Sequence, residues 1–324
     1  MKAAYYEAYG DPSVVEIRDI NKPVPGDDDV LVKVHGTIVS SGDARMRAFD
    51  LPALFRVPGR LMLGWPIPKK PVLGFAYSGV VDAVGKNVTT FKPGDEVLGG
   101  HVGGAHAEYD CVPAKGPIVR KPAGLSFEAA ATIPFGPNTA LAFLEKAKVG
   151  AGTRILIIGA SGSVGAYAVQ LASYLGAEVT AVCSGANARF VTELGATDII
   201  DYTKQDLRSI GETFDVVFET VGSATFADVL PLLTPTGTFV TAVMAPSDLV
   251  PMLWPFARKG RKIVGGEVDV TPGRLGYLAD LMASGDLEPV IDSRFTLATI
   301  RDAHARVDTK RKRGDVVVAV AQPA

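Results

Sequence analysis

The chain has 324 residues, and its 33 Lys and Arg almost balance its 35 Asp and Glu, for a formal net charge of −2. With 47% hydrophobic and 21% charged residues, it can form one or two domains with sizeable cores. The near-neutral charge argues against a polyanion ligand, so we expect no nucleic-acid partner. We also expect no membrane partner, because no apolar run is long enough to span a bilayer. Two cysteines, Cys111 and Cys183, favour a reducing, cytoplasmic setting without disulfides.

Short β runs separated by proline and glycine turns characterise the first part of the chain, up to about residue 122. The runs at 30–35, 79–85 and 92–97 predict an antiparallel, barrel-like domain. Residues 48–70 interrupt this pattern with several Pro and Gly and predict a long irregular segment. Such a segment is either a binding lid or a disordered loop, and the sequence leaves both open.

Residues 159–165 read Gly-Ala-Ser-Gly-Ser-Val-Gly and connect the apolar run 154–158 to a helical stretch at 166–172. Glycines at such a turn let a pyrophosphate approach the helix N-terminus, although a tight turn without a ligand also recruits glycine. Further apolar runs separated by helical stretches follow at 179–183, 198–201, 214–219, 238–243 and 262–265. Six such runs predict a doubly wound parallel sheet of the α/β class, which favours a dinucleotide site.

The segment after the second of these strands, 183–189, contains no carboxylate. An acidic residue at this place accepts hydrogen bonds from the adenosine ribose and repels a 2′-phosphate. Ser184 can instead donate to a phosphate and Arg189 can neutralise it, so we predict NADPH rather than NADH. In the alternative, Ser184 is only a helix N-cap and Arg189 a solvated helix residue.

Two elements are expected after the parallel sheet. An amphipathic helix over 274–282 should end near Gly285, and a strand over 315–320 should return to the first domain. Between them, the basic run 310–313 predicts a solvated loop rather than a nucleic-acid patch, because no basic face accompanies it.

Motifs along almost the whole chain resemble the medium-chain dehydrogenase/reductase superfamily, and within it the zinc-free quinone oxidoreductase-like branch. They include Pro71-Val72-Leu73-Gly74, the segments 91–97 and 104–109, and the glycine turn. The resemblance implies an active site in the cleft between two domains. These are a GroES-like β-barrel catalytic domain, residues 1–122 and 273–324, and a Rossmann NADPH-binding domain, residues 123–272.

Positions that resemble the superfamily's catalytic zinc ligands hold other residues here. Ser40 stands where zinc-dependent relatives have a cysteine, and Phe75-Ala76 replaces their His-Glu pair. The cysteines of the structural zinc lobe are absent as well. His101 and His106 share one loop and could improvise a site, but neither a cysteine nor a suitably spaced carboxylate accompanies them. We therefore predict no bound metal.

The resemblance also implies cofactor contacts in the second domain. The glycine turn would cradle the pyrophosphate, Tyr202 would lie at the adenosine 2′-phosphate, and Thr139 would lie near the nicotinamide. Residues that follow the fifth and sixth strands would line the nicotinamide slot. The predicted NADPH-binding residues are Thr139, Ser161, Gly162, Ser163, Val164, Ser184, Arg189, Tyr202, Val243, Met244, Gly265 and Gly266.

Without a metal, the resemblance implies hydride transfer from NADPH to a small hydrophobic acceptor. This acceptor would be a quinone or the C=C bond of an α,β-unsaturated carbonyl. Ser40 and Tyr77 are the candidate catalytic donors near the substrate carbonyl. In the alternatives, Ser40 is a turn residue, Tyr77 is a packed core aromatic, and solvent or the cofactor ribose protonates the product.

Apolar residues of two segments would either wall the acceptor or form a dimer contact. The first segment contributes Leu51, Leu54, Phe55, Leu61, Met62, Leu63 and Trp65, and the second contributes Met252, Leu253, Trp254 and Phe256. The resemblance implies a homodimer. Two other functions stay open: an enoyl-thioester reductase, which would need a basic channel for its carrier, and a non-catalytic NADPH-binding protein.

Overall fold

The computed structural model describes residues 1–50, 53–64 and 66–320. The chain divides into two compact units, Met1–Asn138 with Val270–Ala324, and Thr139–Asp269. The first boundary lies later than the expected 122/123, because helix α3 (Phe127–Thr132) packs on β3, β4 and β15 of the first unit. The second boundary lies close to the expected 272/273.

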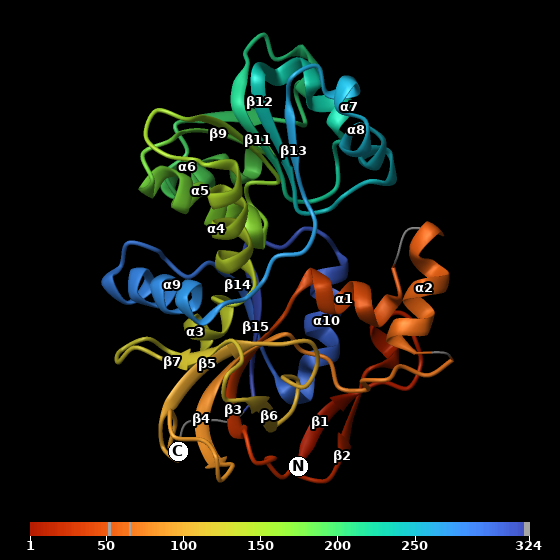
Figure 1. Cartoon of the computed structure of the whole chain (residues 1–324), viewed down its shortest axis with the longest axis vertical. Coiled ribbons are helices and arrows are strands. Elements are labelled where there is room, and N and C mark those ends of the chain that lie inside the picture. The colour runs from red at the N-terminus through yellow and green to blue at the C-terminus, as the bar shows by residue number, and fades with distance from the viewer. Residues whose placement is uncertain (51–52, 65, 321–324) are drawn as a thin grey trace. The chain divides into compact units, whose positions relative to one another are not determined.

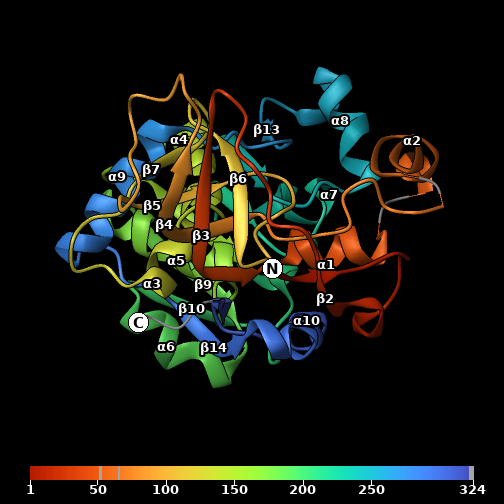
Figure 2. The ribbon, with the colours of Figure 1, turned by 90° about the horizontal axis from the view of Figure 1, so that it is seen from below.

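The first unit contains a seven-stranded sheet in the order β14-β15-β3-β4-β5-β7, with β6 paired to β3. All of these pairings are antiparallel except that of β14 with β15. Figure 2 shows β3, β4 and β6 side by side. The strands are β3 (Asp29–Val39), β4 (Ala76–Val84), β5 (Glu96–Gly100), β6 (Tyr109–Pro113), β7 (Ile118–Arg120), β14 (Ile291–Thr296) and β15 (Asp315–Ala319).

This sheet confirms the predicted antiparallel domain and the return of the last strand to it. Val316–Ala319 of β15 pairs with Gly36–Val39 of β3. The run expected at 92–97 is shorter, because Lys92–Asp95 forms a turn and β5 begins only at Glu96. A separate antiparallel pair joins β1 (Lys2–Tyr5) to β2 (Glu16–Asp19).

Among the described residues, five helices and two 3₁₀ turns complete the first unit. The prediction of an irregular segment over 48–70 is wrong, because α2 occupies 53–63. Pro58 and Gly59 lie in the middle of α2, but the Arg60 guanidinium lies over the rings of Tyr9 and Phe49, 4.5 and 4.1 Å from their centroids, and packing of this kind stabilises a helix beyond its propensity. The predicted helix near 274–282 is confirmed and ends at Gly285, which has φ +86°. The elements are η1 (Pro12–Val14), α1 (Ser41–Ala48), α2 (Ala53–Leu63), α3, α9 (Pro272–Ser284), η7 (Leu297–Thr299) and α10 (Ile300–Asp308).

The second unit is built on a six-stranded, fully parallel sheet in the order β10-β9-β8-β11-β12-β13. This confirms the doubly wound sheet that the six apolar runs predict. The order reverses between β8 and β11, which is where open parallel sheets bind their ligands. The strands are β8 (Arg154–Ile158), β9 (Glu178–Cys183), β10 (Asp198–Asp201), β11 (Phe214–Glu219), β12 (Leu233–Thr241) and β13 (Lys262–Val264).

Helices cover both faces of the parallel sheet, with α5 and α6 on one side and α7 and α8 on the other (Figure 1). The link from β10 to β11 contains only the 3₁₀ turn η3 (Leu207–Ser209). No helix in the described ranges is long and apolar enough to cross a membrane. The helices are α4 (Gly136–Ala147), which spans the unit boundary, α5 (Ser163–Tyr174), α6 (Ala188–Glu193), α7 (Phe226–Val229) and α8 (Leu249–Leu253), with turns η2 (Gly185–Asn187), η4 (Leu230–Leu232), η5 (Pro246–Asp248) and η6 (Pro255–Arg258).

Candidate functional site

The glycine turn between β8 and α5 has three glycines with three different constraints. Gly159 adopts φ +80°, which favours glycine. A Cβ on Gly165 would lie 2.2 Å from the Gly159 carbonyl oxygen, so this position needs a glycine for close packing. A Cβ on Gly162 would meet only the Gly159 oxygen, at 3.4 Å, and otherwise faces open space. The turn therefore leaves room at Gly162 for a group to approach the backbone.

Gly162 is also the N-cap of α5, and no side chain caps this helix end. The first amides of a helix have no partner within the helix, and its dipole attracts negative charge. Together with the space at Gly162, this end of α5 forms a cradle for a pyrophosphate. The predicted residues Ser161, Ser163 and Val164 lie on either side of Gly162, so the turn fits a dinucleotide.

Asn187, which the sequence analysis missed, ties this turn to the loop after β9. Its side-chain amide donates to Ser161 Oγ at 3.0 Å, and its backbone N–H donates to the Ser184 carbonyl at 2.8 Å. The Ser184 side chain makes no capping hydrogen bond. Arg189 is 93% exposed on α6 and pairs with Glu193 at 2.8 Å. Arg189 is therefore a solvent-exposed helix residue, as in the alternative. The Ser184 hydroxyl does not cap the helix and can bind another group.

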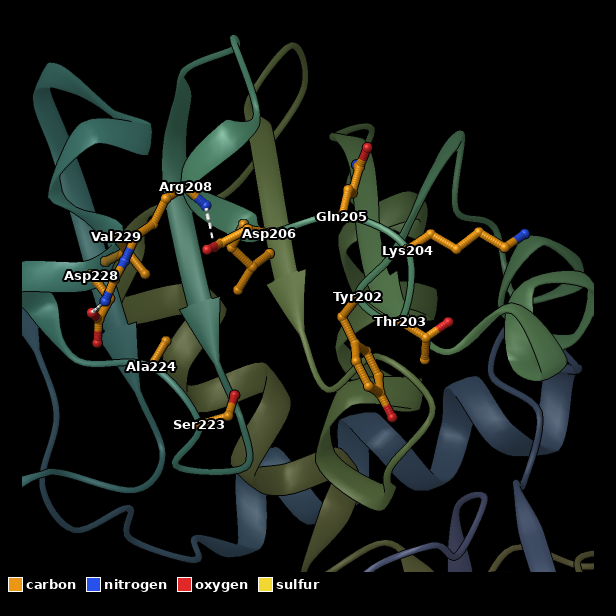
Figure 3. A pocket seen from close by; sticks show the side chains of 11 residues that line it. Tyr202, Thr203, Lys204, Gln205, Asp206, Arg208, Ser223, Ala224, Asp228 and Val229 are labelled. Carbon is orange, nitrogen blue, oxygen red and sulfur yellow. Dashed lines mark hydrogen bonds and ion pairs between the residues drawn. The ribbon is translucent and has the colours of Figure 1, made fainter.

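A pocket of about 640 Å³ lies beside the loops that follow β10 and β11. Figure 3 shows Tyr202, Thr203 and Lys204 on one side of it and Ala224, Asp228 and Val229 on the other. Tyr202 is 59% exposed, and Lys204 Nζ lies 3.7 Å from the Asp201 carboxylate. Tyr202 and Lys204 thus offer a hydroxyl and a cation for a phosphate at the predicted adenosine end. The sequence analysis did not single out Lys204, although it lies two residues after Tyr202.

Glu219, the last residue of β11, is a buried carboxylate that organises the adjoining loop. It accepts hydrogen bonds from the backbone N–H groups of Val221 at 3.0 Å and of Gly222 at 2.8 and 2.7 Å. Ser223 N–H donates to it as well, at 3.0 Å. Burial raises the pKa of Glu219, while these donors act in the opposite direction. The sequence could have pointed to Glu219, because it is an acidic residue at the end of an apolar strand.

This loop lies against the glycine turn. A Cβ on Gly159 would stand 2.6 Å from Val221 Cγ1 and 2.7 Å from Thr220 Oγ1. Glu219 therefore fixes the backbone that forms one wall of the cradle.

The residues predicted to line the nicotinamide slot lie after β12 and β13. Thr241 Oγ1 donates to the Val243 carbonyl at 2.9 Å and accepts from Val243 N–H at 3.2 Å. A Cβ on Gly265 would stand 2.6 Å from Met244 Cε, so these two loops touch. Gly266 adopts φ +98°. Thr139 lies on α4 and is half-buried.

Ser40 is the N-cap of α1 and belongs to a capping box with Asp43. Its hydroxyl donates to Asp43 Oδ2 at 2.6 Å and accepts from Asp43 N–H at 3.1 Å. The other carboxylate oxygen accepts from Gly74 N–H at 3.2 Å. The Ser40 proton is therefore engaged within the fold, as in the alternative that made Ser40 a local structural residue.

Tyr77 lies on β4 and is 1% exposed, packed in the core of the first unit with Val34, Val81 and Val97. Burial raises its pKa well above the ordinary value, and the Asp110 carboxylate adds to this. The packed-core alternative therefore describes Tyr77, and its hydroxyl is not open to a substrate.

The two histidines of the loop before β6 have separate partners. His106 is fully buried and its Nε2 lies 2.9 Å from the Ile38 carbonyl. His101 Nε2 lies 2.7 Å from Asp110 Oδ2. Within residues 1–50, 53–64 and 66–320, no three His, Cys, Asp or Glu side chains are grouped so as to hold a metal ion.

Two apolar segments were considered for the acceptor. In the first segment, Leu61 is 73% exposed, while Leu51 and Trp65 lie outside the described residues. Near the second segment, Val250, Leu253, Trp254 and Phe256 are exposed, by 66, 81, 66 and 88%.

A parallel sheet with a glycine cradle, joined to an antiparallel GroES-like unit, defines a two-domain dinucleotide-binding protein. An alcohol dehydrogenase GroES-like domain matches residues 26–123, and a zinc-binding dehydrogenase domain matches residues 194–318. The chain is 32% identical to a quinone oxidoreductase of Pseudomonas aeruginosa, over 98% of this chain and 99% of that protein. It is 30% identical to a chloroplastic NADPH-dependent alkenal/one oxidoreductase of Arabidopsis thaliana, over 98% and 79%.

Among solved structures, the quinone oxidoreductase from Coxiella burnetii superposes with a TM-score of 0.90, at 30% identity and over 99% of both chains. The chain therefore belongs to the medium-chain dehydrogenase/reductase superfamily, in its quinone oxidoreductase-like branch.

Proposed function

We propose that this protein is a zinc-independent oxidoreductase that uses NADPH to reduce a quinone or the C=C bond of an α,β-unsaturated carbonyl. The observation that carries the proposal is the cradle at Gly162, where an uncapped helix end meets space for a pyrophosphate. The relatives support the acceptor class, since one is a quinone oxidoreductase and another an NADPH-dependent alkenal/one oxidoreductase.

NADPH, when bound, supplies the hydride that reduces the acceptor. The residues of the second unit would bind and orient it. The N-terminus of α5 would hold the pyrophosphate, and Glu219 would keep the 220–223 loop in place beside it. Tyr202 and Lys204, which line the pocket, would receive the adenosine 2′-phosphate together with Ser184, whose hydroxyl caps no helix, and Lys204 would supply the positive charge. Thr139, Val243, Met244, Gly265 and Gly266 stay the proposed residues of the nicotinamide end.

Zinc independence rests on the residues at the superfamily's metal positions. Ser40 caps α1 through Asp43, and Phe75 and Ala76 carry no metal-binding group. Both cysteines are free thiols, so the fold needs no oxidising compartment, and we propose the cytoplasm.

We also propose a homodimer. Four exposed apolar side chains lie on α8 and η6 and in the link between them, in the segment that leads to β13, and β13 is an edge strand of the parallel sheet. A patch of this kind next to an open strand edge is a favourable surface for a second copy of the chain.

The test is NADPH consumption by the purified, chelator-treated protein with a simple quinone and with a trans-2-alkenal, with product analysis. Formation of the hydroquinone or the saturated aldehyde, with NADPH preferred over NADH, is the expected result. Tight NADPH binding without turnover of either acceptor would contradict the proposal and favour a non-catalytic NADPH-binding protein. A strong preference for enoyl thioesters over free enals would favour a thioester reductase.

A further inference from the structure

A second pocket lies wholly within the first unit, where the start of the chain meets helices α1 and α2. Its volume is about 340 Å³, which is within the range of small-molecule sites. It is separate from the proposed cofactor site, whose residues all belong to the second unit. The described residues that line the pocket include two arginines and no acidic side chain. They are Tyr9, Ala48, Phe49, Arg56, Val57 and Arg60.

The two arginines share one face of α2, because Arg56 and Arg60 are four residues apart on this helix. Two cations at this spacing repel each other and weaken an isolated helix. Pro58 and Gly59 stand between them and weaken it further. Both arginines nevertheless line the same pocket. An anion bound between the two guanidinium groups would turn this repulsion into attraction and stabilise α2.

Two aromatic rings hold the guanidinium of Arg60 in place. Its central carbon lies 4.5 Å from the centroid of the Tyr9 ring and 4.1 Å from that of the Phe49 ring. The two rings also contact each other, with centroids 5.0 Å apart. Ring contacts use the face of a guanidinium, whereas carboxylate and phosphate oxygens bind to the N–H groups at its edge. The rings therefore orient this cation without competing with an anion.

Phe49 has a backbone conformation that bulky residues rarely adopt. It is the C-cap of α1, with φ +52° and ψ +40°, in the left-handed region. Glycine or asparagine is usual where a helix ends in this conformation, so an aromatic residue there is strained. Such strain persists where the surrounding structure requires it, and it is frequent at ligand sites. Here it places the Phe49 ring against Tyr9 and Arg60 in the pocket.

The lining other than the two arginines is mainly apolar. Ala48 and Val57 contribute methyl groups, and Tyr9 and Phe49 contribute their rings. Burial raises the pKa of the Tyr9 hydroxyl, and the positive charge of Arg60 acts in the opposite direction. The pocket thus offers apolar surface for a flat group next to two cations.

We propose that this pocket binds a small aromatic anion, whose carboxylate or phosphate pairs with Arg56 and Arg60 and whose ring packs on the apolar lining. The inference goes beyond the proposed function and does not depend on it, because every lining residue named belongs to the first unit. Carboxylates and phosphates both accept paired N–H donors from guanidinium groups. The test therefore includes one aromatic probe of each kind.

The probes are phenyl phosphate, benzoate and inorganic phosphate, each titrated into the full-length protein by isothermal titration calorimetry. The variants are Arg56→Gln and Arg60→Gln, with Arg45→Gln as the matched control. Arg45 is exposed on the preceding helix α1 and does not line the pocket, so its loss changes the net charge equally. Hydrogen exchange of α2 and of the glycine turn, 159–165, shows where a probe binds.

We expect an aromatic anion to bind the wild type and to slow hydrogen exchange in α2, because the bound state holds the helix together. Arg56→Gln and Arg60→Gln should each weaken this binding about tenfold, and Arg45→Gln should keep it. Arg56 is exposed, so its variant removes a charge without removing the ring contacts of Arg60. Inorganic phosphate should bind more weakly than phenyl phosphate, because it buries no apolar surface.

Absence of binding by both aromatic anions would overturn the inference. Equal losses of affinity in Arg45→Gln and in the two α2 variants would overturn it as well, because only the net charge would then matter. Protection of residues 159–165 without protection of α2 would place the anion in the cradle of the second unit and also contradict the inference. All of these results leave the proposed reductase function standing, since turnover with NADPH tests that function separately.

Discussion

Gly165 on α5 packs so closely on Gly159 that the carbonyl oxygen of Gly159 lies 2.2 Å from where a Gly165 Cβ would be. The strand end and the helix start thus touch through backbone atoms alone. This contact fixes the direction in which the first turn of α5 presents its N–H groups.

Gly165→Ala should therefore disturb the cradle rather than only the packing. We expect a loss of about 1–3 kcal/mol in the free energy of unfolding, together with weaker NADPH binding. Gly150→Ala is the matched control, because a Cβ there meets nothing within 4 Å. Thermal unfolding and NADPH titration of both variants make the measurement, and equal behaviour would contradict the close-packing argument.

Glu219→Gln should weaken NADPH binding about tenfold, because an amide keeps one acceptor oxygen and turns N–H donors toward the loop amides. Glu212→Gln, on the surface beside Arg154, is the control. Isothermal titration calorimetry gives the dissociation constant of NADPH for each of the two variants. An unchanged affinity in Glu219→Gln would show that the 220–223 loop does not shape the cofactor site.

Lys204→Ala should raise the KM for NADPH about tenfold and leave that for NADH unchanged, because only the 2′-phosphate needs the positive charge. Arg189→Ala should change neither, since Arg189 does not line the pocket that Tyr202 and Lys204 share. Steady-state kinetics of both variants with NADPH and with NADH show which cation binds the 2′-phosphate. The reverse outcome would restore Arg189 as the phosphate ligand.

His304 on α10 gives an acid-sensitive core. It is fully buried, its ring lies 5.6 Å from that of His106, and neither of its ring nitrogens has a hydrogen-bond partner among the described residues. Burial, His106 and Arg47 lower its pKa well below the ordinary value. The unfolded chain therefore binds a proton that the folded chain rejects, and stability falls as the pH drops below about 6.5.

His304→Leu should remove this part of the pH dependence. We expect the Tm of the wild type to fall more steeply than that of the variant between pH 7 and pH 5. At pH 8, His304 is neutral in both the folded and the unfolded wild type. The difference in Tm between wild type and variant at this pH therefore reports packing alone. Parallel Tm curves across the whole range would contradict the assignment.

Leu253→Asp combined with Phe256→Asp should convert the proposed dimer into a monomer, because charges would replace two of the most exposed apolar side chains. Tyr174→Asp, on α5, is the control for an exposed apolar residue elsewhere. Light scattering after gel filtration gives the mass. A monomeric wild type would remove the proposal of a dimer.

The sheet of the second unit could be predicted from the sequence because every buried parallel strand is a short apolar run, and five of the six match within one residue at each end. Helix α2 could not, because Pro58 and Gly59 stand in its middle and dominate the local signal. Its formation depends on tertiary packing, such as that of Arg60 over the rings of Tyr9 and Phe49, which a local pattern does not contain.

Some parts of the candidate site could likewise be predicted from the sequence and others could not. The cradle could be predicted because its glycines are adjacent in sequence to a strand and a helix. The pairing of His101 with Asp110 was missed, because the sequence analysis considered His101 only as a metal ligand and the pair forms through the folding of the loop around Gly104. Glu219 was missed because it looks like the end of an apolar strand.

The pairing of β15 with β3 sets an order for folding during synthesis. β3 is made early, but its neighbour β15 belongs to the last part of the described chain. All six strands of the parallel sheet leave the ribosome in one continuous stretch between these two. We expect the nucleotide-binding unit to fold first, while residues 36–39 of β3, on the edge whose other end pairs with β6, stay unpaired and exposed to aggregation until the final strand arrives.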